Sequence, residues 1–411
     1  MNLYDELVWR ESIAQVSDEK IADVLNNDKV NFYLGIDPTG DSMHVGHLFG
    51  LINCRRLQLA GHNPILLVGG ATGMIGDPSG KSAERNLLTK EDIDYNVNAL
   101  RNQISKLIDS KMVNNYDWTV QYDVITFLRD IGKYFNINNM LAKESVKSRL
   151  DKGLSFTEFT YQVLQGLDYL KLYQSDKVTL QVGGTEQWGN IIAGMDLIRK
   201  VEGHEAETYG LNWPLITKRD GTKFGKTESG AVWLDSEKTS PYEFYQFWFN
   251  TQDADVMTYL KQFTFLTKAQ IEEIEVSFKE EPHRRVAQKA LAEEVTKLVH
   301  GEDGYNQALN ITQALFSGNI KGLNAKEIEI GFKDVLAGTL SEDVNLVDAL
   351  IEAKLAQSKR EAREFIKGNA VSVNGDKVNE LEFVISKDNA IESEFTVLRR
   401  GKKKYALLKH N

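Results

Sequence analysis

Cysteine and proline are scarce in this chain of 411 residues, which contains one Cys and six Pro. The single cysteine, Cys54, excludes an intramolecular disulfide and a metal site built from several cysteines. No run of 18 apolar residues occurs, so no segment is predicted to span a bilayer. The first residues include early acids and no apolar core, which is unlike a secretory signal. We therefore expect a protein of the reducing cytoplasm.

Positive charge is also in deficit, since 49 Lys and Arg face 59 Asp and Glu. The whole chain therefore lacks the charge typical of a nucleic-acid-binding protein. The C-terminal part differs, because residues 344–411 hold 13 basic and 10 acidic residues and the last fourteen hold six basic and none acidic. Such a tail is either a solvated face or a contact for a polyanion. The length predicts two or three domains.

The N-terminal half reads as alternating strands and helices. Residues 30–36 alternate between apolar and polar side chains, which predicts a strand with one polar face. A helix is expected from near His44 to Gly61, with Asp41 or Ser42 as its N-cap, followed by an apolar strand over 64–70. A further helix over 155–173 and a strand over 178–184 continue the pattern. This order predicts an α/β fold with a Rossmann-like, doubly wound parallel sheet.

The C-terminal half is expected to be organised differently. Residues 241–317 carry mostly helical patterns, and the periodicity weakens over 320–343, where we predict a linker. The block from 344 begins with two helical segments and continues with VSVNGDKV, in which Asn374–Gly375 predicts a hairpin turn.

The segment DPTGDSMHVGH (37–47) places His44 and His47 at the start of the first predicted helix. Imidazoles beside the free N–H groups of a helix N-terminus suit a phosphate, and Gly46 allows a flat group to approach the backbone. A zinc site of the His-Glu-x-x-His type is disfavoured because the required Glu is absent. A purely structural role also fits this segment when it is taken alone.

Two glycine-containing loops supply cations. Residues 69–85 follow a strand but match neither a P-loop nor a dinucleotide fingerprint, and they leave Lys81 and Arg85 as available charges. Residues 218–230 offer Lys223, Lys226 and Thr227 to a polyphosphate. Each loop alone is equally consistent with a solvated surface loop.

Three polar residues, Tyr161, Gln165 and Asp168, lie at i, i+4 and i+7 and share one face of the predicted helix. They form either a site for a small polar ligand or a plain solvent-facing stripe.

Five segments are more informative together than separately. They are YLGIDPTGDSMHVGH (33–47), VGGATGMIGDPSGKSAER (68–85), FTYQVLQGLDYL (159–170), LQVGGTEQWGN (180–190) and DGTKFGKTESG (220–230). This set resembles the bacterial tyrosyl-tRNA synthetases, which are class I aminoacyl-tRNA synthetases, and the C-terminal block resembles their S4-like RNA-binding domain. The resemblance extends over essentially the whole chain.

The resemblance implies a catalytic domain over 1–228 with a dimer-forming insertion, a helical domain over 229–319, the linker and an RNA-binding domain over 344–411. It implies that L-tyrosine and ATP, with Mg²⁺, form tyrosyl-adenylate and pyrophosphate, and that the tyrosyl group passes to tRNA-Tyr. It further implies a homodimer and no protein-bound metal. Positioning and charge stabilisation would then carry the catalysis.

The resemblance also assigns roles to individual residues. The implied catalytic residues are Thr39, His44, His47, Lys81, Arg85, Lys223, Lys226 and Thr227. The implied tyrosine-binding residues are Tyr33, Asp77, Tyr161, Gln165, Asp168 and Gln181. The implied ATP- and adenylate-binding residues are Gly35, Asp37, His44, Gly46, His47, Gly183, Gly184, Glu186, Gln187 and Lys226; the family often has Asp where this chain has Glu186.

The RNA-binding residues are expected in two basic clusters of the last block. They are Lys359, Arg360, Arg363, Arg399, Arg400, Lys402, Lys403 and Lys404. Two alternatives remain open at this point: a small nucleotidyltransferase, which also carries a His-x-Gly-His element, and a catalytically silent RNA-binding or splicing paralogue.

Overall fold

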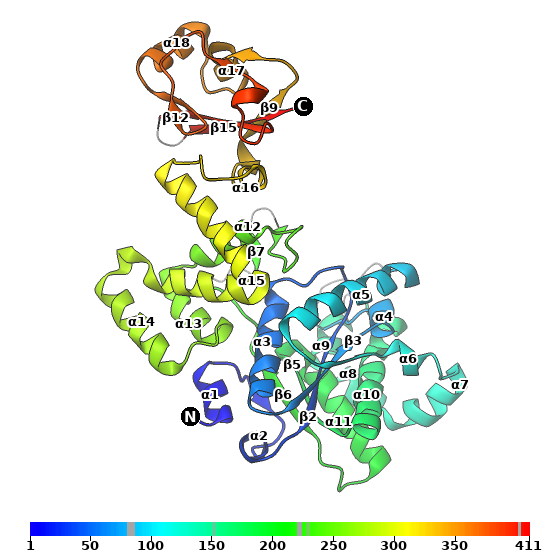
Figure 1. Cartoon of the computed structure of the whole chain (residues 1–411). Helices are drawn as coiled ribbons and strands as arrows, with labels where there is room; N and C mark the ends of the chain where they lie inside the picture. The colour runs from blue at the N-terminus through cyan, green and yellow to red at the C-terminus, as the bar shows by residue number, and fades with distance from the viewer. Residues whose placement is uncertain (80–86, 151–152, 220–223, 228–229, 402–403) are drawn as a thin grey trace. The chain divides into compact units, whose positions relative to one another are not determined.

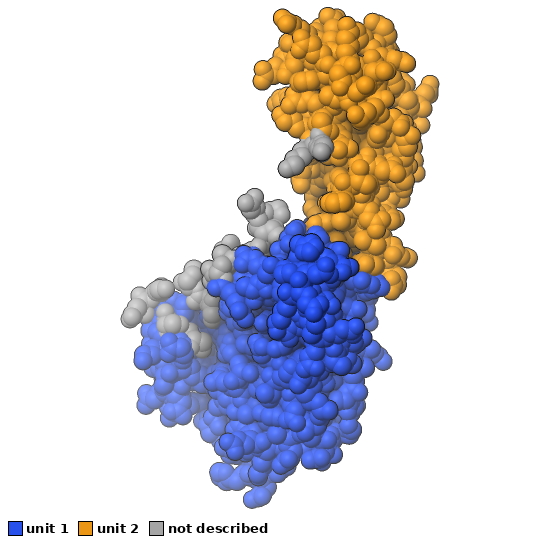
Figure 2. Space-filling view, turned by 90° about the vertical axis from the view of Figure 1, so that its left-hand side faces the viewer, with its two compact units in different colours: residues 1–239, 248–299 blue, residues 240–247, 300–411 orange. Residues whose placement is uncertain are grey.

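The computed structural model of the chain describes residues 1–79, 87–150, 153–219, 224–227, 230–401 and 404–411 (Figure 1). The chain forms two compact units, coloured separately in Figure 2. Unit 1 comprises Met1–Thr239 and Trp248–Val299, and unit 2 comprises Ser240–Phe247 and His300–Asn411. Among the described residues, no helix combines the length and apolarity needed to cross a membrane.

A six-stranded sheet forms the centre of unit 1. Its order is β1-β6-β5-β2-β3-β4, and only β1 runs antiparallel to its neighbour. The strands are β1 (Gln15–Val16), β2 (Asn31–Ile36), β3 (Asn63–Val68), β4 (Lys111–Asn114), β5 (Val178–Gly184) and β6 (Tyr209–Trp213). This parallel sheet confirms the doubly wound α/β prediction, and the expected strands over 30–36, 64–70 and 178–184 are β2, β3 and β5.

The strand order reverses between β2 and β5. From β2 the chain moves outward to β3 and β4, and later returns to β5 and continues to β6 on the other side. Crevices at the carboxyl ends of strands on either side of such a reversal are where open α/β sheets bind ligands. The topology therefore predicts a ligand site formed by the residues that follow Ile36 and those that end β5.

Helices cover both faces of this sheet (Figure 1). Tyr33, Ile65 and Leu67 pack with residues of α10 and α11, while Leu34 lies on the side of α3. On the face of β2 predicted to be polar, Tyr33 is therefore buried and 1% exposed, whereas Gly35 is exposed. The helices of unit 1 that precede β6 are α1 (Leu3–Trp9), α2 (Ile21–Asn27), α3 (Val45–Leu59), α4 (Thr72–Ile75), α5 (Lys90–Leu107), α6 (Tyr116–Thr119), α7 (Val124–Thr126), α8 (Ile137–Leu141), α9 (Glu144–Leu150), α10 (Phe156–Asp176) and α11 (Trp188–Glu202).

The expected helical region over 241–317 is also present. It contains α12 (Pro241–Phe249), α13 (Asp253–Phe263), α14 (Lys268–Glu280) and α15 (Val286–Ser317). A short ladder of β7 (Lys226–Thr227) and β8 (Gly230–Ala231) precedes it.

Unit 2 contains a five-stranded sheet with the order β12-β11-β14-β15-β9. Asn374 (φ 50°) and Gly375 (φ 92°) form the predicted turn between β11 and β12, in the left-handed region that such a turn requires. The remaining elements are α16 (Ala325–Gly331), β9 (Leu336–Leu340), β10 (Val344–Asn345), α17 (Leu346–Glu352), α18 (Lys359–Lys367), β11 (Val371–Val373), β12 (Asp376–Lys377), β13 (Val384–Ile385), β14 (Phe395–Arg400) and β15 (Lys404–His410).

The segment 320–343, predicted to be a linker, instead contains α16 and β9. Strand β9 pairs in parallel with β15 at the end of the chain, and Ile328 and Phe332 are buried against Phe395 and Leu407. The apolar residues of this segment follow no single period because a short helix and an edge strand share them. Its order comes from long-range contacts, which local periodicity does not report.

Candidate active site

A cavity of about 740 Å³ lies at the carboxyl ends of β2 and β5. Every predicted catalytic, tyrosine-binding or ATP-binding residue whose side chain is described lines it. These residues are Tyr33, Gly35, Asp37, Thr39, His44, Gly46, His47, Asp77, Tyr161, Gln165, Asp168, Gln181, Gly183, Gly184, Glu186 and Gln187. Lys81, Arg85 and Lys223 lie outside the described residues, as do the side chains of Lys226 and Thr227.

The N-cap of α3 is His44, so the expectation of Asp41 or Ser42 is wrong. The Nδ1 atom of His44 accepts the Gly46 N–H at 3.0 Å, and Nδ1 of His47 accepts the His44 N–H at 3.2 Å. His44 has an extended backbone (φ −118°, ψ 172°) directly before the helix, which places the cap two or three residues further along than expected. The two imidazoles thus satisfy N–H groups that a helix start leaves free.

This capping arrangement fixes the imidazole tautomers. With Nδ1 accepting in both rings, the neutral forms carry their proton on Nε2 and act as donors there. The rings lie 4.0 Å apart between centroids. Glycine is also needed at position 46 for steric reasons, because a Cβ there would lie 2.7 Å from His44 Cε1. The segment therefore offers donors and a helix N-terminus to the cavity, a combination suited to phosphate.

A buried carboxylate marks the other end of the predicted site. Asp168 of α10 is 3% exposed, and its two oxygens accept hydrogen bonds of 2.9 Å from Asn115 Nδ2 and Trp118 Nε1. Burial raises the pKa of Asp168 to about 7, although the two hydrogen bonds oppose that rise. This carboxylate retains lone pairs for a further donor.

The hydroxyl of Tyr33 is buried beside this carboxylate. Within the described part of the chain its Oη has no hydrogen-bond partner. Burial, and then the nearby charge of Asp168, raise the pKa of Tyr33 well above its usual value, so the phenol stays neutral. A buried hydroxyl without a partner lowers the stability of the fold unless a ligand forms a hydrogen bond with it.

Two further buried acceptors face the same cavity. Gln165 Oε1 and Gln181 Oε1 both lack a partner among the residues described. Asp77 nearby accepts a 2.6 Å hydrogen bond from Gln187 Nε2 and one of 2.9 Å from the Ser79 N–H. Unpaired oxygens and a carboxylate together suit a cationic donor such as an ammonium group.

A hydrogen-bond network joins these groups to the end of β2. Tyr161 Oη and Thr72 Oγ1 each donate to one oxygen of Asp37 at 2.7 Å. Asn115 Nδ2 donates to Thr72 Oγ1 as well as to Asp168. The network orients the side chains around the cavity before any ligand is present.

The glycines that end β5 allow close approach of the chain to itself. A Cβ at Gly183 would lie 3.2 Å from Gln187 Cβ, and one at Gly184 would collide with the carboxylate of Glu186. Glu186 therefore lies across the backbone of Gly184, at the edge of the cavity.

The segment 224–227 meets the start of α3. Gly225 (φ 75°) lies directly on it, since a Cβ there would be 2.8 Å from Val45 Cγ2 and 3.8 Å from Gly46 N. The backbone of Lys226 and Thr227 forms β7. The start of α3 and residues 224–227 belong to two of the five motif segments, 33–47 and 220–230, which we call the signature segments. Although far apart in sequence, they are adjacent in the fold here.

Sequence reasoning missed Asn115, Trp118 and Thr72. Asn115 is fully buried and its Oδ1 accepts the Ala71 N–H at 2.8 Å. The one available signal was position, because Asn115 directly follows the parallel strand β4, which ends at Asn114.

The predicted RNA-binding residues lie in unit 2. Lys359, Arg360, Arg363 and Lys404 are exposed. Lys359 and Arg360 form ion pairs with Asp348 (2.6 Å) and Glu364 (3.2 Å).

The remaining described basic residues of this set make internal contacts. Arg399 lies over the ring of Tyr405, and Arg400 lies over Phe365 and donates to Leu355 O at 2.8 Å. Lys402 and Lys403 lie outside the described residues.

Comparison with known proteins identifies the family. A family model described as tRNA synthetases class I (W and Y) matches residues 25–317, and one described as Tyrosine--tRNA ligase SYY-like C-terminal domain matches residues 327–408. Tyrosine–tRNA ligase 2 of Bacillus cereus is 54% identical over 417 residues, with 100% of both chains covered. Tyrosine–tRNA ligase of Geobacillus stearothermophilus is 53% identical over 419 residues, again with 100% of both covered.

A solved structure agrees with these matches. The C-terminally truncated mitochondrial tyrosyl-tRNA synthetase of Aspergillus nidulans is 31% identical, with a TM-score of 0.69, over 77% of this chain and 94% of that one. These similarities confirm the resemblance drawn from the motifs and favour an enzyme over a silent paralogue. The chain belongs to the class I tRNA synthetases of the tryptophan and tyrosine group, and within it to the tyrosine–tRNA ligases.

Proposed function

We propose that this chain activates L-tyrosine with ATP, supplied as its magnesium complex, and transfers the tyrosyl group to tRNA-Tyr. The observation that carries the proposal is the unpaired Tyr33 hydroxyl beside the Asp168 carboxylate, two buried groups that line the cavity. A phenol hydroxyl is donor and acceptor at once, so it complements a neutral hydroxyl and a carboxylate together. Phenylalanine would leave the buried Tyr33 hydroxyl without a partner and would bring no donor to the Asp168 carboxylate.

The amino acid's ammonium group would lie among Gln165, Tyr161 and Asp77, with Gln181 as a further acceptor. Its carboxylate would then point toward the start of α3. In the first step a carboxylate oxygen attacks the α-phosphorus, an acyl-phosphate bond forms, and pyrophosphate leaves. No protein base is needed, since the nucleophile is already ionised.

The nucleotide would occupy the part of the cavity lined by Gly46, His47 and the end of β5. His44 and His47, as Nε2 donors at a helix N-terminus, would stabilise charge on the phosphates together with Thr39. Lys81, Arg85, Lys223, Lys226 and Thr227 would add to this at the pyrophosphate. Asp37, Gly35, Gly183, Gly184, Glu186 and Gln187 would line the adenylate.

In the second step a hydroxyl of the terminal tRNA adenosine attacks the tyrosyl carbonyl and AMP leaves. The exposed basic residues of unit 2 would contact the tRNA backbone. We accordingly assign catalysis to residues 1–228, an approach to the anticodon to 229–319 and RNA binding to 344–411. The cytoplasm is the compartment where tRNA charging would take place.

We also propose a homodimer formed through the segment that follows β4. Large apolar side chains are exposed there, including Val124 at 72%, Ile125 at 70% and Leu128 at 51%. Contiguous exposed apolar surface marks interaction sites. We assign a second copy of the chain as the partner at this surface. The segment begins with Asn115 and Trp118, which both donate hydrogen bonds to Asp168. In a dimer, the interface would therefore be linked to the tyrosine site of each subunit.

The test is tyrosine-dependent exchange of pyrophosphate into ATP, run in parallel with phenylalanine and tryptophan, followed by charging of tRNA-Tyr. We expect exchange with tyrosine alone and subsequent charging. Exchange with tryptophan would overturn the substrate assignment, and folded protein without any exchange would overturn the proposal.

A further inference from the structure

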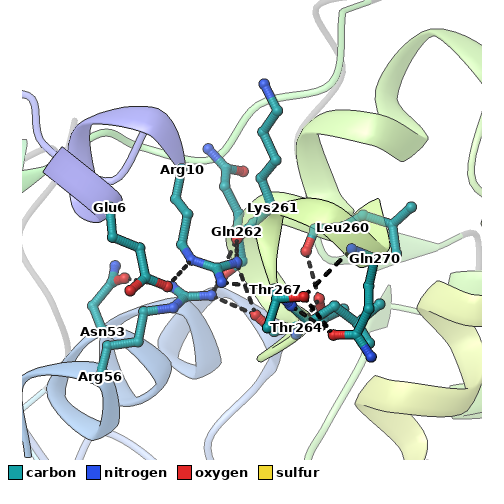
Figure 3. A network of polar contacts seen from close by, with 11 residues as sticks. Glu6, Arg10, Asn53, Arg56, Leu260, Lys261, Gln262, Thr264, Thr267 and Gln270 are labelled. Carbon is teal, nitrogen blue, oxygen red and sulfur yellow. Dashed lines mark hydrogen bonds and ion pairs between the residues drawn. The ribbon is translucent and has the colours of Figure 1, made fainter. Parts of the chain in front are cut away.

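Two buried arginines attach the end of α13 to α3 and to the residue that follows α1 (Figure 3). Arg56 of α3 and Arg10, just after α1, are 5% and 2% exposed. Neither belongs to a motif discussed above, and neither lines the cavity. Burying two positive charges is costly unless hydrogen-bond acceptors surround them.

Those partners are carbonyls at the C-terminus of α13. Arg56 donates to the carbonyls of Lys261 (3.1 Å), Gln262 (2.8 Å) and Thr264 (2.8 Å). Arg10 donates to those of Lys261 (2.8 Å), Thr264 (3.2 Å) and Leu266 (2.7 Å). The last carbonyls of a helix lack helical partners and carry its partial negative charge.

Side-chain oxygens accept two further hydrogen bonds, while Arg56 Nε has no partner among the described residues. Arg10 Nε donates to Glu6 Oε1 at 2.7 Å, and Arg56 donates to Asn53 Oδ1 at 2.7 Å. Glu6 is thus the one carboxylate bonded within this pair of guanidinium groups, and it pairs with Arg10; the carbonyls at the helix end supply the other negative partial charges. Most of the hydrogen bonds of this cluster therefore attach one helix end to two other elements.

The same helix end carries aromatic residues that support the signature segment. Phe263, adjacent to Thr264, stacks on Phe224 with ring centroids 5.3 Å apart and an interplanar angle of 26°. Tyr259 of α13 also contacts Phe224, at 5.1 Å. Phe224 lines the cavity, and Gly225 after it lies on Val45 and Gly46.

A closed path of contacts results. It runs from the start of α3 along the helix to Arg56, across to the end of α13, through Phe263 to Phe224, and back to Val45. We propose that Arg10 and Arg56 are positioning residues for tyrosine activation, which set the Phe224–Gly225 segment against the start of α3. This inference rests on the proposed function, because tyrosine activation is the step in which both signature segments would act.

The experiment compares Arg56→Met and Arg56→Lys with Arg55→Met as the matched control. Arg55 is the neighbouring residue on α3 and donates to Gln58 of the same helix. The readouts are kcat of tyrosine-dependent ATP–pyrophosphate exchange and the Kd of tyrosine without ATP. Tyrosine would bind at the Tyr33–Asp168 end, which the path does not include.

For Arg56→Met we expect kcat to fall by about 10- to 100-fold, the effect of a small misplacement of reacting groups, with the Kd of tyrosine within about twofold. Arg56→Lys should recover part of the loss, since an ammonium group can still donate to the carbonyls. Arg55→Met should match the wild type. Unchanged kcat in folded Arg56→Met, or a Kd that rises as much as kcat falls, would overturn the inference.

A double-mutant cycle gives an independent answer if Arg56→Met does not fold. It combines Arg56→Lys with Phe224→Leu, at the two ends of the path. Losses that act through one path should be less than multiplicative in kcat. Multiplicative losses would overturn the inference, whereas a wild-type enzyme without exchange would refute the proposed function itself.

Discussion

Asn115 donates its side-chain amide to the carboxylate of Asp168 over 2.9 Å, from a position with no exposed surface. With Trp118 on the other oxygen, the carboxylate is oriented by donors on two sides while burial disfavours its charge. The outcome is a pKa of about 7, so a small change in surroundings decides whether Asp168 is ionised at neutral pH.

This balance predicts a pH-dependent affinity for tyrosine. A phenol hydroxyl donates to the ionised carboxylate, so ligand binding favours the deprotonated form and the Kd should rise as the pH falls from 8 to 6. Calorimetric titration over that range measures the trend and the proton released near pH 7. Asp168→Asn should bind more weakly, by about 10- to 100-fold, without this pH dependence. A wild-type Kd that is flat across the range would contradict the assignment.

Tyr33→Phe tests the unpaired hydroxyl. Removing a buried group that has no partner should leave the stability of the ligand-free protein unchanged or higher, while the preference for tyrosine over phenylalanine in kcat/KM falls by about tenfold. Tyr169→Phe is the matched control, because its hydroxyl is bonded to the carbonyls of Thr179 and Tyr209 at 2.9 Å. That variant should lose stability instead. Loss of stability in Tyr33→Phe, with specificity intact, would assign the hydroxyl a structural role.

Aspartate at Val124 and Ile125 should separate the subunits. Charges at these two exposed apolar positions would be desolvated in an interface, so the double variant should sediment as a monomer where the wild type sediments as a dimer. Val276→Asp on α14, at a position that is 57% exposed, is the control. A monomeric wild type at micromolar concentration would end the homodimer proposal.

Alanine at Lys359, Arg360 and Arg363 should weaken tRNA charging and leave tyrosine-dependent pyrophosphate exchange unchanged. The slope of log affinity against log salt should decrease by about one for each phosphate contact removed. Lys321→Ala with Lys326→Ala, two exposed positions of the same unit, is the control. An equal loss in both steps would contradict the division of labour between the two parts of the chain.

His62 predicts a loss of stability in acid. Its ring accepts the Val30 N–H through Nδ1 at 3.3 Å and contacts Leu25 O through Nε2 at 3.1 Å, which requires the neutral form. Burial lowers the pKa of His62, so its stabilisation is present above the unfolded value, about 6.5, and is lost as the pH falls through the folded value.

The measurement is unfolding followed by tryptophan fluorescence, which reports unit 1 because all six Trp lie in it. His62→Phe should cost about 1–3 kcal/mol at pH 8 through its lost hydrogen bonds, and less at pH 5. His204→Gln, at an exposed position, should show no such change. A deficit of equal size at both pH values would show that His62 does not titrate on unfolding.

Local sequence determined the regular elements of this protein and its family. Alternation and apolar runs are properties of neighbouring residues, so β2, β3, β5, α10 and the Asn374–Gly375 turn were predictable within a few residues. The strand–helix–strand order then limits the sheet to a doubly wound topology. The residues of five motif segments were enough to show the chain's resemblance to the tyrosine–tRNA ligases.

Tertiary structure alone decided how the cavity is completed. Asn115 and Trp118 reach Asp168 from more than 45 residues away, and nothing in their local pattern distinguishes them from surface polar residues. Three other features depend likewise on which segments of the chain pack against each other. They are the pairing of β9 with β15, the helix cap supplied by His44 and the contact of Arg56 with α13. Periodicity records which side of an element is buried, whereas the identity of the partner is set only when the elements pack.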